Sequence, residues 1–177
     1  MKLLRTLRLD LSDTLSFPQA APPGEWAIPG GFAFTGVDPA TLPGKERVAF
    51  RSGFLGLPSL GWSTLAQIVT ASAEDRDAAV ALLAQGLVKR FGAPSIDAAR
   101  EAAVAEIDFT ISLCDHPIGT VIAVHRTSEG GDIRERFRRL QPRPDGGSCE
   151  AFSFAIEPDE APAEKVDLTA LAQDKRL

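Results

Sequence analysis

The chain has 177 residues, of which 44% are hydrophobic and 24% are charged, which suits one domain with a sizeable core. Its formal net charge of −5 argues against general binding to nucleic acid, because such binding depends on neutralising phosphates. The sequence has no apolar run long enough to span a bilayer and no secretory signal at its start. We therefore expect a cytoplasmic protein with no nucleic-acid or membrane partner.

The first third of the chain predicts short strands separated by proline-rich connections. Over residues 3–11, Leu3, Leu7 and Leu9 share one parity, which indicates a half-buried strand with Arg5 as an exception on the apolar side. A turn is expected at 12–14. A strand pair or bulged strand is expected over 25–34, where Pro29 cannot donate to a ladder. Another strand is predicted over 47–56.

The middle of the chain has the most regular pattern. Residues 61–71 are apolar and β-branched with almost no charge, which predicts an interior strand. Ser72 followed by acids starts a helix over about 73–92, and Gly92 and Pro94 end it. Ser95 opens a second, alanine-rich helix over about 95–114.

A hairpin follows the helices, with strands over 119–127 and 133–140 joined at 128–132, and a short strand is expected at 151–156. Residues 157–177 form an acidic tail that we expect to be partly ordered at most. Segregated runs of strands and helices favour an α+β fold in which a mostly antiparallel sheet packs one face against two helices. We predict a single α+β domain over 1–156.

The sequence contains two cysteines and two histidines that would nominally make a four-ligand zinc site: Cys114, His116, His125 and Cys149. Structural zinc sites are built from paired ligands such as Cys-x-x-Cys, and this spacing lacks them. A buried thiol at a helix end and two structural histidines are the favoured interpretation, with no metal, no cofactor and no disulfide.

An enzymatic interpretation uses some of the same atoms. Cys114 would attack, His116 or His125 would act as the base, and Asp115 would orient the base. Neighbouring positions in sequence rarely converge on one reacting atom, and no motif marks an oxyanion hole. We therefore predict no catalytic residue, and a small enzyme or a ligand-binding or metal-binding protein with a site near these residues is the alternative.

The clearest charged feature is the second strand of the hairpin. With a period of two, Arg134, Arg136 and Arg138 share one face, while Ile133 and Phe137 share the other. Three guanidinium groups in a row could bind phosphate, carboxylate or an acidic partner surface. The favoured alternative is an exposed strand face whose charge is balanced by nearby acids.

Aromatic residues gather in the first half of the sheet. Most of them are expected in the core, and some could form a dimer surface on a sheet face that the helices leave uncovered. This is the reason for expecting self-association. The residues are Trp26, Phe32, Phe34, Phe50, Phe54 and Trp62.

Several short motifs resemble a small family of uncharacterised proteobacterial proteins. They are LLRTLRLD at 3–10, GEWA at 24–27, FAF at 32–34, RSGFLG at 51–56, GWSTL at 61–65 and HPIGT at 116–120. The resemblance carries over no activity and no catalytic residue. It implies a non-catalytic accessory or interaction protein that serves a cofactor-dependent redox enzyme system.

Overall fold

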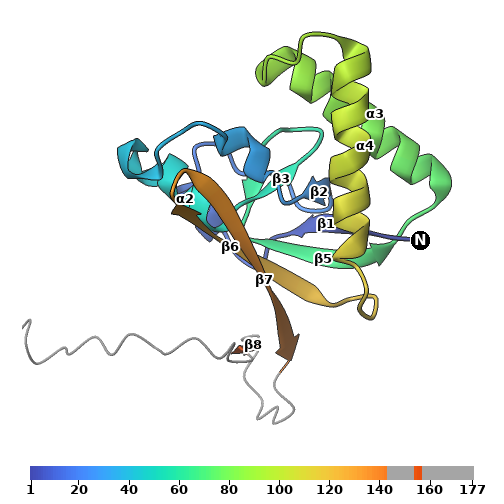
Figure 1. Ribbon diagram of the computed structural model, residues 1–177. Helices are drawn as coiled ribbons and strands as arrows, with labels where there is room; N and C mark the ends of the chain where they lie inside the picture. The colour runs from blue at the N-terminus through green and yellow to red at the C-terminus, as the bar shows by residue number, and fades with distance from the viewer. Residues whose placement is uncertain (143–153, 157–177) are drawn as a thin grey trace, which may run out of the picture.

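The computed structural model describes residues 1–142 and 154–156 (Figure 1). Their strands form one antiparallel sheet in the order β4-β3-β2-β1-β5-β6-β7-β8. The strands are β1 Lys2–Leu7, β2 Trp26–Ile28, β3 Phe54–Gly56, β4 Trp62–Ser63, β5 Leu65–Thr70, β6 Val121–Glu129, β7 Asp132–Pro142 and β8 Phe154–Ile156. The predicted tail at 157–177 and Cys149 lie outside the described residues.

Helices supply the second layer and confirm the α+β class. Figure 1 shows α3 and α4 together over β1 and β5, with α2 beside β6 at the other end of the sheet. The helices are α1 Ser12–Ser16, α2 Gly44–Ser52, α3 Ala73–Arg90 and α4 Ile96–Ser112, with short 3-10 helices at Gly31–Phe34 and Pro39–Thr41. No helix in the described part of the chain is long and apolar enough to cross a membrane.

The two long helices begin where their caps predict. The Ser72 hydroxyl accepts a hydrogen bond from the Asp75 amide at 3.1 Å, and the Asp75 carboxylate accepts one from the Ser72 amide at 2.9 Å. Ser95 accepts from the Ala98 amide at 3.1 Å in the same way. Each bond satisfies an amide that the first helical turn leaves without a partner. The predicted helices at 73–92 and 95–114 are thus confirmed to within about two residues at each end.

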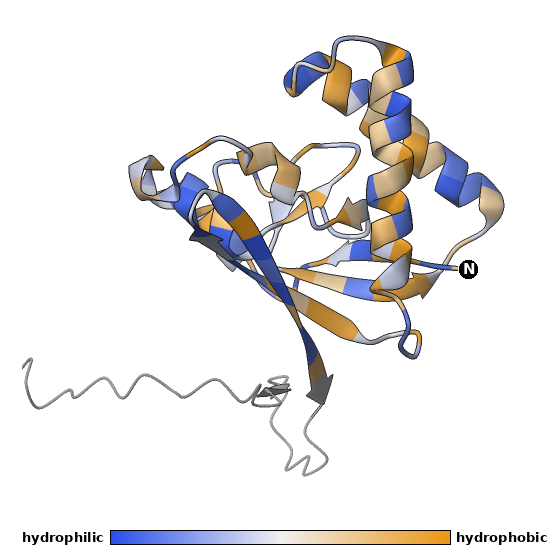
Figure 2. Ribbon diagram, viewed as in Figure 1, coloured by the Kyte–Doolittle hydropathy of each residue, from blue (hydrophilic) through white to orange (hydrophobic). Residues whose placement is uncertain are grey.

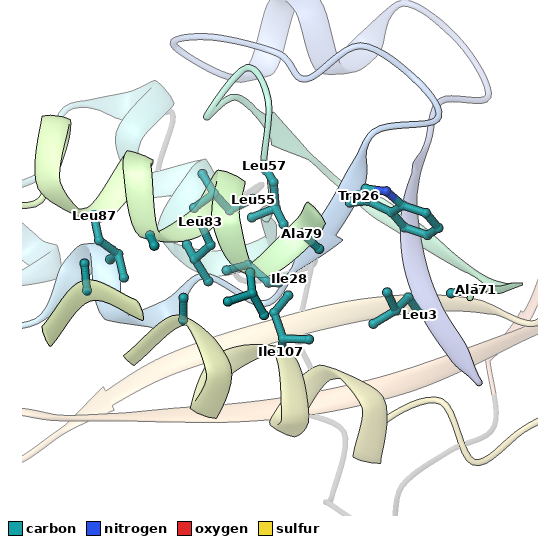
Figure 3. Packing of buried hydrophobic residues seen from close by; sticks show 14 residues of the cluster. Leu3, Trp26, Ile28, Leu55, Leu57, Ala71, Ala79, Leu83, Leu87 and Ile107 are labelled. Atoms are coloured by element: carbon teal, nitrogen blue, oxygen red, sulfur yellow. The ribbon is translucent and has the colours of Figure 1, made fainter. Parts of the chain in front are cut away.

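The main core cluster lies between α3, α4 and the first three strands. Figure 3 shows Leu83 of α3 and Ile107 of α4 converging on Ile28 of β2. A second cluster contains Leu4, although its neighbour Leu3 belongs to the first. Both faces of β1 are therefore buried, and the predicted half-buried strand is wrong in this respect, because β1 is a central strand.

The sheet is strongly curled. In a flat sheet, strands five positions apart would be separated by about 24 Å. Phe54 of β3 and Phe137 of β7 are five positions apart in the strand order, yet their ring centroids are 6.5 Å apart. This curl brings the β6–β7 hairpin back toward the segment that joins α2 to β3, where the candidate site lies.

Two strand predictions in the first half are wrong. Residues 47–56 form most of α2 and then β3, because Ala49 and Phe50 pack inward as helical neighbours and Gly53 ends the helix. The segment 25–34 forms one strand, β2, followed by a 3-10 helix, because Pro29 and the left-handed Gly30 (φ 75°) end the strand. The turn expected at 12–14 is the start of α1.

The hairpin is confirmed. Gly130 and Gly131 have φ values of 62° and 93°, as a two-residue turn between twisted strands requires. β6 and β7 then pair without interruption from Glu129 and Asp132 to Val121 and Leu140. Within the described residues, β8 supports the short strand expected at 151–156.

Candidate functional site

The β6–β7 hairpin places His125 and the predicted arginine row on one face. His125 is the Cα partner of Arg136, and the neighbouring pairs are Ala123 with Arg138 and Thr127 with Arg134. Side chains of directly opposite residues share a face, so these groups project on the same side of the hairpin. Figure 2 shows the part of the hairpin near its turn as predominantly hydrophilic.

Helix α2 lies against β6 and adds further positive charge. Between them is an open hollow of about 380 Å³. Arg47, on its rim, is held by hydrogen bonds from Nη2 to the carbonyls of Ala40 and Leu42 at 3.2 and 2.9 Å. The lining residues are Pro39, Ala40, Arg47, Phe50, Arg51, His125, Arg126, Thr127 and Ser128.

Three arginines act electrostatically on His125. The pKa of His125 is lowered from its ordinary value of 6.5, first by burial and then by the positive charges of Arg51, Arg138 and Arg136. The imidazole is therefore neutral at pH 7, with one nitrogen able to donate and one able to accept.

Within the described residues, the positive charge around the hollow is only partly balanced. Arg134 pairs with Glu129 at 2.6 Å, and both side chains are exposed. Arg51, Arg136 and Arg138 form no ion pair with any carboxylate in the described part of the chain. A cluster of unneutralised guanidinium groups favours anions, which it can bind through charge-assisted hydrogen bonds. We call Arg51, His125, Arg136 and Arg138 the basic cluster.

Arg126 lies directly behind this cluster and was missed by the sequence analysis. It points to the opposite face from His125 and is only 1% exposed. Its Nε donates to Glu135 at 2.6 Å, its Nη1 to the carbonyls of Phe50 and Gly53 at 3.1 and 2.7 Å, and its Nη2 to the carbonyl of Pro29. Carbonyls at the end of α2 are thereby satisfied by a cation, which suits the negative end of a helix.

This arginine fixes the position of the basic cluster. Phe50 precedes Arg51 and Gly53 follows it by two positions. The hydrogen bonds from Arg126 to their carbonyls therefore hold the last turn of α2 against β6 beside His125. One signal in the sequence could have revealed the role of Arg126. Arg126 and Glu135 both fall on the inward parity of the hairpin, where Val124 and Phe137 also lie, and a charged pair at two inward positions indicates a buried ion pair.

A second carboxylate approaches this pair from α4. The pKa of Glu106 is raised above its ordinary value, first by burial and then by the negative charge of Glu135, with Arg126 acting in the opposite direction. Glu106, Glu135 and Arg126 therefore form a partly buried charged group between α4 and the hairpin.

The model of a family of unknown function, DUF6505, matches residues 1–159. The chain belongs to this family. No curated protein and no solved structure matches it. Membership in the DUF6505 family agrees with the resemblance to an uncharacterised family and assigns no activity, so the function has to be argued from the site.

The chemistry of Cys114 in this family member does not favour a nucleophile. The thiol is 3% exposed, its Sγ donates to the Thr110 carbonyl at 3.3 Å, and burial raises its pKa to about 11. A thiol with a raised pKa is rarely a thiolate at neutral pH, and the thiolate is the form that attacks or binds metal.

The remaining candidates have separate surroundings. Asp115 is exposed. The backbone of His116 is held by two hydrogen bonds: its amide N–H donates to the Cys114 carbonyl, and Lys2 Nζ donates to the His116 carbonyl at 2.7 Å. His125 lies in the hollow beside α2. Within residues 1–142 and 154–156, no three His, Cys, Asp or Glu side chains are placed to hold a metal ion.

Proposed function

We propose that this protein is a non-catalytic binding protein whose basic cluster holds an acidic segment of a protein partner. The observation that carries the proposal is the convergence of Arg51, Arg136 and Arg138 around His125 without a carboxylate partner in the described residues. An anion at this position would relieve the mutual repulsion of three guanidinium groups and accept their hydrogen bonds.

The spacing of the cluster favours an extended peptide over a small substrate. Arg136 and Arg138 are alternate residues of one strand, so their Cα atoms are about 6.5–7 Å apart. Carboxylates at alternate positions of an extended segment have the same repeat, which allows several pairs to form together. The hollow beside them is open, and its lining contains cations, a neutral imidazole and apolar side chains but no activated nucleophile.

An accessory role in a cofactor-dependent redox system, which the sequence resemblance implies, is compatible with this kind of binding. We place the protein in the cytoplasm, where a reducing environment keeps Cys114 as a free thiol.

Self-association as a dimer remains a prediction, although its original basis is weaker. The aromatic side chains that suggested a dimer surface are buried or packed against the core clusters. Among the residues that the structure describes, the most exposed large apolar side chains are instead those of Leu11 and Leu15 around α1, at 71% and 75%. Light scattering on the purified protein, compared with a Leu11→Ser/Leu15→Ser variant, tests whether this surface mediates a dimer.

Calorimetry with the full chain and a synthetic peptide that has glutamate at alternate positions tests the binding function. Arg136→Gln and Arg138→Gln should each weaken binding by about tenfold, which corresponds to about 1.4 kcal/mol. Arg90→Gln, an exposed arginine in the last turn of α3, is the matched control and should bind as the wild type does. Equal affinity in all three variants, or no binding at low salt, would contradict the proposal.

A further inference from the structure

A small cavity lies where β1 ends, beside α1 and the connection between β4 and β5. Its volume is about 120 Å³, which is the space that about four water molecules occupy in the liquid. Arg8, Asp10, Ser12, Asp13 and Thr64 supply its polar lining, and leucines supply the rest. The cavity shares no lining residue with the hollow beside α2, so the two are different sites.

The fold holds the walls of the cavity in place. Leu7, the last residue of β1, is the Cα partner of Leu65 in β5. The Asp13 carboxylate accepts hydrogen bonds from the Thr64 amide at 3.3 Å and from the Thr64 hydroxyl at 2.6 Å, which fastens α1 to the β4–β5 connection. A preformed cavity needs little reordering when a ligand enters, and this favours affinity.

Arg8 brings a buried donor to the cavity. Its Nη2 donates to the Ala21 carbonyl at 2.5 Å, which anchors the guanidinium. Its Nε is buried, and within residues 1–142 and 154–156 it is the only buried side-chain nitrogen or oxygen atom that lacks a hydrogen-bond partner. An unused buried donor is unfavourable, because it has given up its hydrogen bond to water. A hydrogen-bond acceptor in the cavity would remove this cost.

Asp13 brings the opposite charge. Only 4% of this residue is exposed, and the donors to its carboxylate are neutral groups of Thr64 and the Ser63 hydroxyl at 3.3 Å. No cation in the described part of the chain forms an ion pair with Asp13. Asp10 adds a second carboxylate at the exposed mouth, where its Oδ1 accepts from the Ser12 amide at 2.8 Å. Buried charges are normally paired, so this wall favours a positively charged group.

The two signs of charge narrow the choice of ligand. Arg8 would repel a metal cation or a simple ammonium ion, and Asp10 and Asp13 would repel a simple anion. A molecule with one group of each sign suits both walls, and the volume limits it to a few atoms. An α-amino acid is a compact molecule of this kind, because its carboxylate and its ammonium are attached to the same carbon atom.

We propose that this cavity binds a small zwitterion of the α-amino acid class, with the ligand carboxylate accepting from Arg8 Nε and the ligand ammonium facing Asp10 and Asp13. The carboxylate gains a charge-assisted hydrogen bond from a donor that is otherwise unused. The ammonium gives Asp13 a partner of opposite charge. The site involves no acidic peptide, so this proposal is independent of the proposed binding function.

NMR titration of the isotope-labelled full chain with glycine and with L-alanine tests the proposal. The signals of the Arg8 Nε–H group and of the Leu9 and Thr64 amides should shift and reach saturation. We expect a dissociation constant of about 1 mM, because the few atoms of such a ligand limit its affinity. Acetate and methylammonium each keep one of the two charges and should bind at least about tenfold more weakly than glycine.

Asp10→Asn and Asp38→Asn are a matched pair of variants. Each aspartate is exposed and accepts a hydrogen bond from the amide two residues later, at 2.8 Å from Ser12 and at 2.9 Å from Ala40. An asparagine oxygen can accept the same bond, and Asp38 does not line the cavity. Asp10→Asn should weaken glycine binding about threefold to fivefold, the effect of one exposed charge, while Asp38→Asn should bind glycine as the wild type does.

Arg8→Lys tests the other wall. It keeps the positive charge but lacks the Nε–H, so it should bind glycine at least about tenfold more weakly. If this variant does not fold, the aspartate pair still decides the outcome. Absence of saturation with both amino acids, equal affinity for acetate and glycine, or equal affinity of Asp10→Asn and Asp38→Asn for glycine would overturn the proposal.

Discussion

Arg126, which is fully buried, and Glu135, whose side chain is 18% exposed, form an ion pair across the β6–β7 hairpin, with 2.6 Å between Arg126 Nε and Glu135 Oε1. They are Cα partners, and they lie on the face opposite to that of His125 and Arg136, which are partners one step along the ladder. One face of the hairpin is thus fastened to the core, while the other presents the basic cluster.

Replacing Arg126 should destabilise the fold strongly. In Arg126→Met, Glu135 loses its cation and the carbonyls of Pro29, Phe50 and Gly53 lose their donor. Removing one partner of a buried pair typically costs about 3–5 kcal/mol. Urea unfolding monitored by tryptophan fluorescence should show a loss of this size in the free energy of unfolding.

The same hairpin provides a control for this effect. Arg134 pairs with Glu129 at 2.6 Å, but both side chains are more than half exposed. Exposed pairs contribute about 0–1 kcal/mol, so Arg134→Gln should change stability by less than about 1 kcal/mol. Similar losses in Arg126→Met and Arg134→Gln would mean that the buried network is not what fastens the hairpin.

Glu106 should make stability depend on pH. Its pKa is raised in the folded protein above the ordinary value of 4.5, first by burial and then by Glu135. The folded state therefore holds a proton more tightly than the unfolded state, and the free energy of unfolding falls as pH rises through the interval between the two pKa values. Glu106→Gln should remove this fall and stabilise the protein at neutral pH relative to the wild type.

Urea unfolding at a series of pH values from below 4.5 to 7 measures this effect. Glu101→Gln, an exposed position in the same helix, is the matched control and should keep the wild-type dependence on pH. A Glu106→Gln variant that follows the wild-type profile throughout would show that the carboxyl is not destabilised by burial.

The helices and strands that could be predicted are those whose ends are set by interactions between residues close in sequence. The caps at Ser72 and Ser95 and the glycines at 130 and 131 act within a few residues, so α3, α4 and the hairpin follow from the sequence. The pattern over 47–56 predicts a strand because Val48 and Phe50 are two positions apart, as residues on one face of a strand are, although residues 44–52 form α2. Its helical form depends instead on packing of Ala49 and Phe50 against distant segments.

The candidate site was only half predictable for a related reason. The alternation of Arg134, Arg136 and Arg138 is a local pattern, and their common face is confirmed. Arg51 was assigned to a strand and could not be placed beside His125. The carbonyls that hold Arg126 are 73 to 97 positions away in sequence, and only the curl of the sheet brings them within hydrogen-bonding distance.

The titration of His125 should report on the basic cluster. Its pKa is lowered by burial and by Arg51, Arg138 and Arg136, so Arg136→Gln should raise the pKa toward the ordinary value. Adding inorganic phosphate to the wild type should also raise it, because a bound anion favours the imidazolium. NMR titration of the imidazole protons measures both changes. An unchanged His125 pKa in Arg136→Gln, with Arg90→Gln as control, would place the arginine too far away to act.

Cys114 should be unreactive in the folded protein. Burial raises its pKa from the ordinary value of 9.0 to about 11, which lowers the thiolate fraction at pH 8 by about a hundredfold. A Cys149→Ser variant leaves Cys114 as the sole cysteine, and Ellman's reagent should label it slowly in buffer and rapidly in urea. Cys114→Ala, if it folds, should lose stability but retain peptide binding, since the thiol belongs to the second core cluster and not to the hollow. Rapid labelling of the folded protein would instead revive Cys114 as a candidate nucleophile.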